Sequence, residues 1–219
     1  MKISIAIDGP AGAGKSTIAK LIGEKYGLMY INTGSMYRAV TLFAMRNNIS
    51  ASQIEELCCL IEGLDMHFMD DNLIVNGEDV TEEIRGEVVT KNVSAYASVL
   101  EVRKKLVEMQ QKIAMKYDVI MDGRDIGTVV LKNASLKVFL TARAEERAKR
   151  RYNELINKKQ DVNYEEILKD IERRDYIDSH REVDPLRKAE DAIELDSSFM
   201  NINQVVDEIS KLIDKKSIR

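Results

Sequence analysis

The chain has 219 residues, 44% of them hydrophobic and 32% charged, with a formal net charge of −4 at pH 7. A chain of this length can bury a full core without a disulfide or a structural metal. The acidic balance argues against a protein that coats nucleic acid, and no apolar run approaches the roughly 18 residues of a membrane span. Since residues 1–7 also lack the length and charged head of a signal peptide, we expect a cytoplasmic protein without nucleic-acid or membrane partners.

Strand and helix patterns alternate along the chain. Apolar, β-prone segments predict five strands at 3–7, 28–31, 118–121, 136–140 and 192–195. Helical spacing predicts helices from about Lys15 and over 34–48, 82–117, 144–158, 164–182 and 201–216. This alternation is typical of an α/β protein with a five-stranded parallel sheet and right-handed crossovers.

Two local patterns interrupt that scheme. Around 65–81 the period becomes β-like, and the pairs Asp71-Asn72 and Asn76-Gly77 are turn formers, so we expect a small antiparallel insertion. Ser52 and Glu55 have the spacing of a capping box, which predicts a helix start there. Within 82–117 we expect apolar packing positions at Val99, Leu106, Ile113 and Met115.

Residues 9–16 match the phosphate-loop pattern G-x-x-x-x-G-K-[ST] between a predicted strand and a predicted helix. Phosphate oxygens must approach backbone N–H groups there, and a Cβ at Gly12 or Gly14 would obstruct the contact or the required dihedrals. Lys15 can meet the β- and γ-phosphates of a nucleotide, and the Ser16 hydroxyl can ligate Mg²⁺. The expected ATP-binding residues are Gly9, Pro10, Ala11, Gly12, Ala13, Gly14, Lys15, Ser16 and Thr17.

An acidic residue is expected at the end of a neighbouring strand, and Asp122 occupies that position, where it could hold Mg²⁺ through water. A switch GTPase would need glycine at position 125, but the sequence there is Asp122-Gly123-Arg124-Asp125. Its guanine motif would end in aspartate, whereas Asn157-Lys158-Lys159-Gln160 ends in glutamine. The sequence therefore disfavours a GTPase.

Arginines gather in segments that follow the loop, although the chain is acidic overall. Bringing two anions together for phosphoryl transfer requires fixed positive charges, and the planar guanidinium can hold phosphate bidentately. The sequence has only two histidines, His67 and His180, and no obvious general base. A phosphate monoester is largely dianionic at neutral pH and needs no base, so this pattern favours a kinase with a phosphate acceptor.

Six segments together resemble the bacterial cytidylate kinases: GPAGAGKST (9–17), NTGSMYR (32–38), EEIR (82–85), MDGRDIGTVV (121–130), EERAKRR (145–151) and RRDYIDSHREVDPL (173–186). The resemblance implies a P-loop NTPase-type sheet with a lid and a small antiparallel β-containing insertion that binds the nucleoside monophosphate. It implies a core at 1–35 and 113–219, with the lid at approximately 145–175, and an insertion at 36–112. The implied reaction is Mg²⁺-dependent transfer from ATP to CMP or dCMP, by a monomer.

The resemblance also implies roles for individual side chains. Arg38 and Arg124 would hold the acceptor phosphate, and Tyr37 would line the acceptor pocket. The residues that would recognise the edge of cytosine are Ser94, Arg103 and Asp125. Those that would bind the sugar, or both sugar and phosphate, are Asp178, Arg174 and Arg181.

The implied catalytic residues are Lys15, Arg124 and two lid arginines, Arg147 and Arg151, that would close over the ATP phosphates. Other functions stay open on the residues alone. One is a P-loop kinase for UMP, AMP or a metabolite, which acceptor choice would reveal. Another is a non-catalytic ATP sensor, which would bind nucleotide without turnover. A third is a nucleic-acid-binding switch, which would show salt-dependent retention on DNA.

Overall fold

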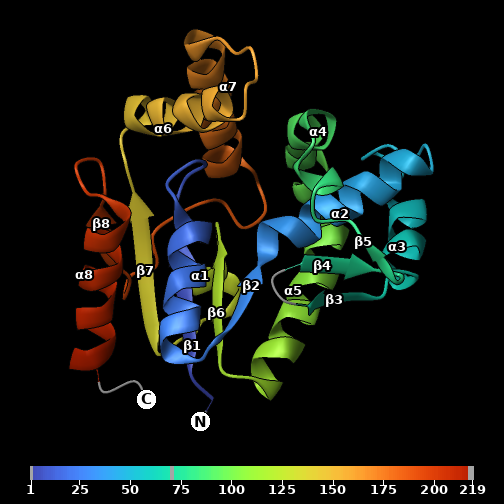
Figure 1. The fold of residues 1–219 in the computed structure, drawn as a ribbon. Coiled ribbons are helices and arrows are strands. Elements are labelled where there is room, and N and C mark those ends of the chain that lie inside the picture. The colour runs from blue at the N-terminus through green and yellow to red at the C-terminus, as the bar shows by residue number, and fades with distance from the viewer. Residues whose placement is uncertain (1, 70–71, 217–219) are drawn as a thin grey trace.

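The computed structural model describes residues 2–69 and 72–216, and its central feature is a five-stranded parallel sheet (Figure 1). The strand order is β2-β6-β1-β7-β8. The strands are β1 (Ser4–Asp8), β2 (Met29–Asn32), β6 (Val119–Gly123), β7 (Leu136–Thr141) and β8 (Ile193–Asp196). All five predicted strands are confirmed, with small shifts at their ends.

Helices cover both faces of this sheet because alternate side chains of each strand point to opposite faces. Ile5 and Ile7 of β1 pack with Ile120 against α1 (Lys15–Tyr26) and α8 (Ile202–Lys215). Ala6 and Met121 belong to a second apolar cluster on the other face, shared with the elements of 33–116. Both faces of the central strands are therefore buried.

The segment after β2 folds beside the sheet, at the right of Figure 1. It contains the helices α2 (Thr33–Arg46), α3 (Ile54–Glu62), α4 (Glu87–Ala97) and α5 (Leu100–Lys116), with a helical turn η1 (Glu83–Arg85). The predicted antiparallel piece is confirmed as β3 (Met66–Met69), β4 (Asn72–Val75) and β5 (Glu78–Asp79). Asn76 and Gly77 form the predicted turn with φ of 51° and 82°, whereas Asp71 of the other predicted turn lies outside the described residues.

Three local expectations were wrong. The continuous helix over 82–117 is divided into η1, α4 and α5, with breaks at Gly86 and at Ser98-Val99. Met115 is 71% exposed, because α5 presents that position to solvent. The capping box at Ser52 does not form: α3 begins at Ile54, and its N-cap residue Gln53 makes no side-chain cap hydrogen bond.

Two long helices, α6 (Ala144–Asn157) and α7 (Tyr164–His180), lie beyond the carboxyl ends of the strands (Figure 1). The loop between β1 and α1 reaches toward them, and a single π-helical turn, η2 (Ile126–Val130), follows β6 nearby. Among the residues that the structure describes, no helix is long and apolar enough to cross a membrane. The carboxyl edge of the sheet thus faces both the α6–α7 pair and the 33–116 segment.

Candidate active site

The glycine-rich loop joins β1 to α1, which confirms the predicted strand–loop–helix context. Gly12 and Gly14 have φ of 74° and 86°, in the left-handed region that favours glycine. A Cβ on Gly9 would lie 2.0 Å from the carbonyl oxygen of Leu140. The loop can therefore take this course only with glycine at these positions, and it places the first amides of α1 at the carboxyl edge of the sheet.

Lys15 begins α1 and is buried, with its Nζ donating a hydrogen bond of 2.7 Å to the carbonyl oxygen of Pro10. Burial lowers the pKa of Lys15 well below its usual value, and the nearby charge of Arg124 lowers it further. Thr17 follows on the exposed side of the helix start. A buried ammonium whose direct partner is a carbonyl oxygen and not a carboxylate is suited to an anionic ligand.

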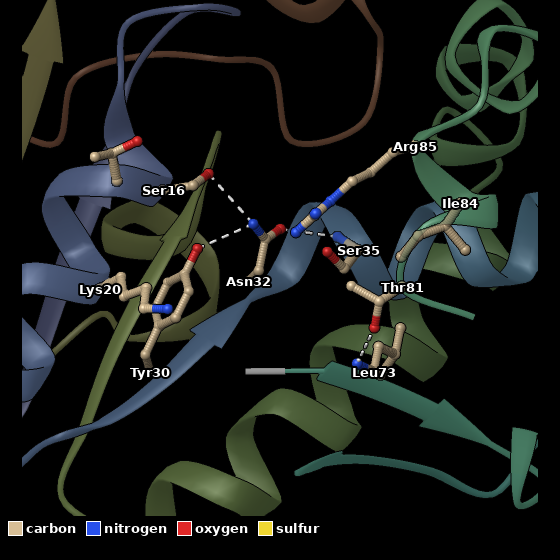
Figure 2. Close-up of a pocket in the computed structure, with 10 residues that line it drawn as sticks. Ser16, Lys20, Tyr30, Asn32, Ser35, Leu73, Thr81, Ile84 and Arg85 are labelled. Carbon is tan, nitrogen blue, oxygen red and sulfur yellow. Dashed lines mark hydrogen bonds between the residues drawn. The ribbon is translucent and has the colours of Figure 1, made fainter. Parts of the chain in front are cut away.

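Asp122 ends its strand beside the loop, as predicted. Ser16 Oγ donates to Asp122 Oδ2 over 2.8 Å, and the Tyr30 hydroxyl donates to Asp122 Oδ1 over 2.9 Å. Asn32 donates from Nδ2 to Tyr30 (3.0 Å) and to Ser16 (3.2 Å), as Figure 2 shows at one wall of a pocket between the phosphate loop and the 33–116 segment. Burial raises the pKa of the Asp122 carboxyl, and Lys15 opposes that shift.

The oxygen set of Ser16 and Asp122 fits Mg²⁺, a hard cation that uses few protein ligands and keeps several waters or phosphate oxygens. Within 2–69 and 72–216, no group of three or more His, Cys, Asp or Glu side chains could hold a metal ion. The protein contribution to a cation site would therefore come from a hydroxyl and one carboxylate beside bound phosphates.

A second cavity lies between α2, α4, the segment after β6 and the end of α7. It brings together side chains from widely separated parts of the sequence. All nine residues that the resemblance assigned to the acceptor line this one cavity: Tyr37, Arg38, Ser94, Arg103, Arg124, Asp125, Arg174, Asp178 and Arg181.

Five arginines and only two carboxylates line this cavity, which leaves an excess of positive charge. Burial lowers the pKa of Arg38 to about 10, and the neighbouring charges of Arg174 and Arg124 add to the shift. Burial and Arg124 also lower the pKa of Arg174, whose buried Nε has no hydrogen-bond partner among the described residues. Arg124, in contrast, is paired with a carboxylate, through Nε to Asp178 Oδ2 at 2.6 Å. Mutual repulsion and an unused donor are features that a bound dianion would relieve.

The other end of the cavity contains a buried network around Asp125. Arg103 is 1% exposed and donates to Asp125 and, over 3.0 Å, to Asp184 Oδ2. Arg181 lies 3.4 Å from Asp125 and donates to the carbonyl oxygen of Asp184. The Ser94 side chain, half-buried on α4, completes this end of the lining. Donors and acceptors therefore lie together in a largely buried network, as recognition of a base edge requires.

The two predicted lid arginines occupy different environments. Arg147 on α6 is buried: its Nη2 lies 2.6 Å from Asp175 Oδ2, and its Nη1 donates to the carbonyl oxygen of Ala11 over 2.8 Å. Arg151 is exposed and pairs with Glu154. Arg147 on α6 therefore contacts both α7 and the phosphate loop, whereas Arg151 faces solvent.

Sequence reasoning missed several partners of these residues. Asp184 and Asp175 are single carboxylates within the quoted RRDYIDSHREVDPL segment, and no spacing rule distinguishes them there. Asn32 also caps α2 by accepting from Ser35 N over 2.9 Å, and Thr33 Oγ1 donates to Asp122 O over 2.7 Å. The only sequence signal was that Asn32 and Thr33 begin the NTGSMYR segment.

The fold and the loop define a class: an α/β protein of the P-loop NTPase type with helices on both faces of its sheet, as predicted. A solved structure of an uncharacterized protein from Eubacterium ventriosum has the same fold, with a TM-score of 0.53, 16% identity and coverage of 98% of this chain and 99% of that chain.

Sequence comparison defines the family. A cytidylate kinase family model matches residues 5–215. A cytidylate kinase of Clostridium perfringens is 64% identical over 213 residues, covering 97% of this chain and 98% of the relative. One of Clostridium acetobutylicum is 66% identical over 216 residues, covering 99% and 100%. The chain belongs to the cytidylate kinase family, which confirms the resemblance found in its motifs.

Proposed function

We propose that the protein transfers the γ-phosphoryl group of ATP to CMP or dCMP, giving ADP and CDP or dCDP. Beyond family membership, one observation carries this proposal: an arginine-rich cavity contains an unused buried donor and a buried polar network, and its lining residues Arg124 and Asp178 interact electrostatically with Lys15 of the phosphate loop. The arginines and the unused donor suit a phosphate monoester, and the buried polar network suits a base.

In the proposed mechanism, an oxygen of the acceptor phosphate attacks the γ-phosphorus while the bond to the β–γ bridging oxygen breaks. No proton has to be removed, since the acceptor is largely dianionic. Arg38, Arg124 and Arg174 hold the acceptor phosphate and reduce repulsion between the two anions. The loop amides and Lys15 hold the donor phosphates, while Arg147 and Arg151 contribute from the lid.

Ser16 directly and Asp122 through water would hold Mg²⁺, which neutralises charge on the phosphate oxygens when bound. Tyr30 and Asn32 keep the Ser16 hydroxyl and the Asp122 carboxylate facing one position. Asp125 would accept from the N4 amine of cytosine, and Ser94 and Arg103 would serve its N3 and O2 side. Tyr37 would line the acceptor pocket. Asp178 would bind the sugar, and Arg174 and Arg181 would span sugar and phosphate.

We also propose the division into a core (1–35 and 113–219), a lid (about 145–175) and an acceptor-binding insertion (36–112), acting as a cytoplasmic monomer. The acceptor cavity has lining residues from each of these parts, among them Ser94, Asp125 and Arg174. Closure of the mobile parts would exclude water that could otherwise hydrolyse ATP.

The test is ADP release from Mg·ATP with CMP, dCMP, UMP, AMP, GMP and no acceptor, measured side by side. We expect fast release with CMP and dCMP only, and none with Lys15→Ala. Fast release with UMP or AMP instead would keep the kinase chemistry and reject cytosine recognition. Nucleotide binding without any acceptor-dependent release would reject the kinase function and favour the ATP sensor.

A further inference from the structure

Asp8 is a buried carboxylate that the mechanism above does not use. It is the last residue of β1 and is followed directly by Gly9 of the phosphate loop. Only 5% of its surface is exposed. Its two oxygens accept hydrogen bonds from successive backbone amides, from Ile126 N over 2.8 Å and from Gly127 N over 2.7 Å.

These two amides need an acceptor from elsewhere in the chain. They begin the turn η2, and the first N–H groups of a helical turn have no acceptor within it. Leaving both without a partner in the interior would be unfavourable, because a buried N–H group has lost its hydrogen bonds to water. Asp8 supplies both acceptors from a neighbouring strand, so the backbone at 126–127 is held at a fixed place relative to the phosphate loop.

The segment held in this way carries acceptor residues. Arg124 and Asp125 immediately precede Ile126 and line the acceptor cavity. Asp125 directly precedes η2, with φ of −144° and ψ of 25°, and its carbonyl oxygen accepts from Val129 N over 2.9 Å. Its backbone is therefore tied to the turn that Asp8 holds. On the C-terminal side of Asp125, the hydrogen bonds to Asp8 are thus the nearest ones that hold this backbone to a residue distant in sequence.

Gly127 shows that the contact is tight. A Cβ on Gly127 would lie 3.3 Å from Asp8 Oδ2 and 3.1 Å from Lys137 Cδ. Since these separations are shorter than ordinary van der Waals contacts, a side chain at 127 would displace the carboxylate or the turn. The close approach of the turn to the carboxylate therefore depends on Asp8 as the acceptor and on the absence of a side chain at Gly127.

We propose that Asp8 is a positioning residue that fixes the backbone bearing Arg124 and Asp125 against the phosphate loop, and so aligns acceptor recognition with the donor site. This inference rests on the proposed function for its kinetic consequence. Its structural consequence, the restraint on the amides of Ile126 and Gly127, holds without any substrate.

The test uses Asp8→Asn in the full-length protein. The amide has one oxygen, so its NH₂ group must face one of the two N–H donors, and the segment has to shift. We expect faster hydrogen exchange in the peptide containing Ile126 and Gly127, a rise of about tenfold in KM for CMP and a much smaller change in KM for ATP.

Asp118→Asn is the matched control. Asp118 Oδ1 accepts from Ile3 N over 2.7 Å, which is the same kind of bond at the opposite ends of the same two strands. Asparagine keeps one oxygen as the acceptor for this single bond, so the variant removes a strand-end charge without breaking the contact and should not separate the two KM values. Gly127→Ala perturbs the same contact from the side of the turn. It should also raise the KM for CMP more than the KM for ATP, so the proposal can be tested even if Asp8→Asn folds poorly.

Three results would overturn the proposal: unchanged exchange at 126–127, equal rises in both KM values, or the same split in Asp118→Asn. Failure of the proposed function is distinguishable, because it would appear as absence of CMP-dependent ADP release in the unsubstituted protein. The exchange measurement would still report whether Asp8 restrains the turn.

Discussion

The buried Nε of Arg174 has no partner within the described residues. Burial and the charge of Arg124 lower the pKa of Arg174, and the carboxylates of Asp178, Asp170 and Asp175 offset only part of that shift. A buried donor without an acceptor costs free energy, as does a charge buried beside a like charge. We therefore expect that Arg174 serves to bind an anionic ligand, which would accept from its Nε and offset the repulsion by Arg124.

Arg174→Ala should accordingly separate function from stability. We expect turnover at subsaturating CMP to fall by at least about a hundredfold, with a melting temperature no lower than that of the unsubstituted protein. Arg173→Ala is the matched control, since Arg173 is the exposed neighbour on α7, paired with Asp170. Steady-state kinetics and thermal unfolding measure both effects; a stability loss with intact kinetics would make Arg174 a structural residue.

Asp8 gives a prediction for the pH dependence of stability. Burial raises its pKa from 3.8 to about 6; Asp125 adds to the shift, while the two amides and Lys15 oppose it. Because the folded pKa lies above the unfolded one, the folded protein holds the proton more tightly. The contribution of Asp8 to stability therefore decreases as pH rises from about 4 to 6.

Relative to Asp8→Asn, the unsubstituted protein should lose about 2 kcal/mol of unfolding free energy between pH 4.5 and 7. Urea unfolding of both proteins across this range measures the difference, and charges common to both cancel in it. A difference that stays constant with pH would mean that the pKa of Asp8 is unshifted.

At the scale of elements, the phosphate loop depends on its glycines in two different ways. Gly9 must be glycine because the backbone of β7 occupies the space of a Cβ, whose distance to Leu140 O would be 2.0 Å. At Gly14 no atom lies within 4 Å of the place where a Cβ would stand, and only the φ of 86° disfavours a side chain. One constraint involves packing between strands and the other involves local backbone strain.

Gly9→Ala should therefore destabilise the protein by several kcal/mol, because the ends of β1 and β7 would have to separate. Gly14→Ala should cost about 1–2 kcal/mol, as for a side chain forced into the left-handed region. Denaturant unfolding of the two variants under identical conditions compares them. Equal losses of stability would show that the contact with Leu140 relaxes easily.

The elements also show what a sequence can predict. The five strands and the phosphate loop were predictable because their signals are local: apolar runs, and glycines ahead of Lys15. The break at Ser98-Val99 was not, since neither residue is a helix breaker, whereas the break at Gly86 had a local signal that the prediction of one helix over 82–117 overlooked. The convergence of Tyr37, Arg103 and Arg181 followed from the family resemblance alone, because no local pattern relates residues so far apart.

At the scale of the whole molecule, the acceptor cavity lies where separate parts of the chain meet. Arg38 lies on α2 in the 33–116 segment, whereas Arg124 follows the central strand β6 and Arg174 belongs to α7. The charges of Arg174 and Arg124 oppose that of Arg38 when no anion is bound. A phosphate bound among the three would be attracted to each of them, so ligand binding should draw the 33–116 segment toward α7.

This closure can be measured with the native Cys59, which is exposed on α3. With Cys58→Ser and a second cysteine introduced by Lys149→Cys on α6, labels at the two positions report the separation of insertion and lid. We expect CMP to shorten that distance and ATP together with CMP to shorten it further. Arg38→Ala should abolish the CMP-induced step, because it removes the anion contact of this segment. It should also shorten the unliganded distance slightly, because one of the opposing charges is gone. If CMP at saturation leaves the distance distribution unchanged, charge neutralisation does not drive closure, and the arginines act only within a cavity of fixed shape.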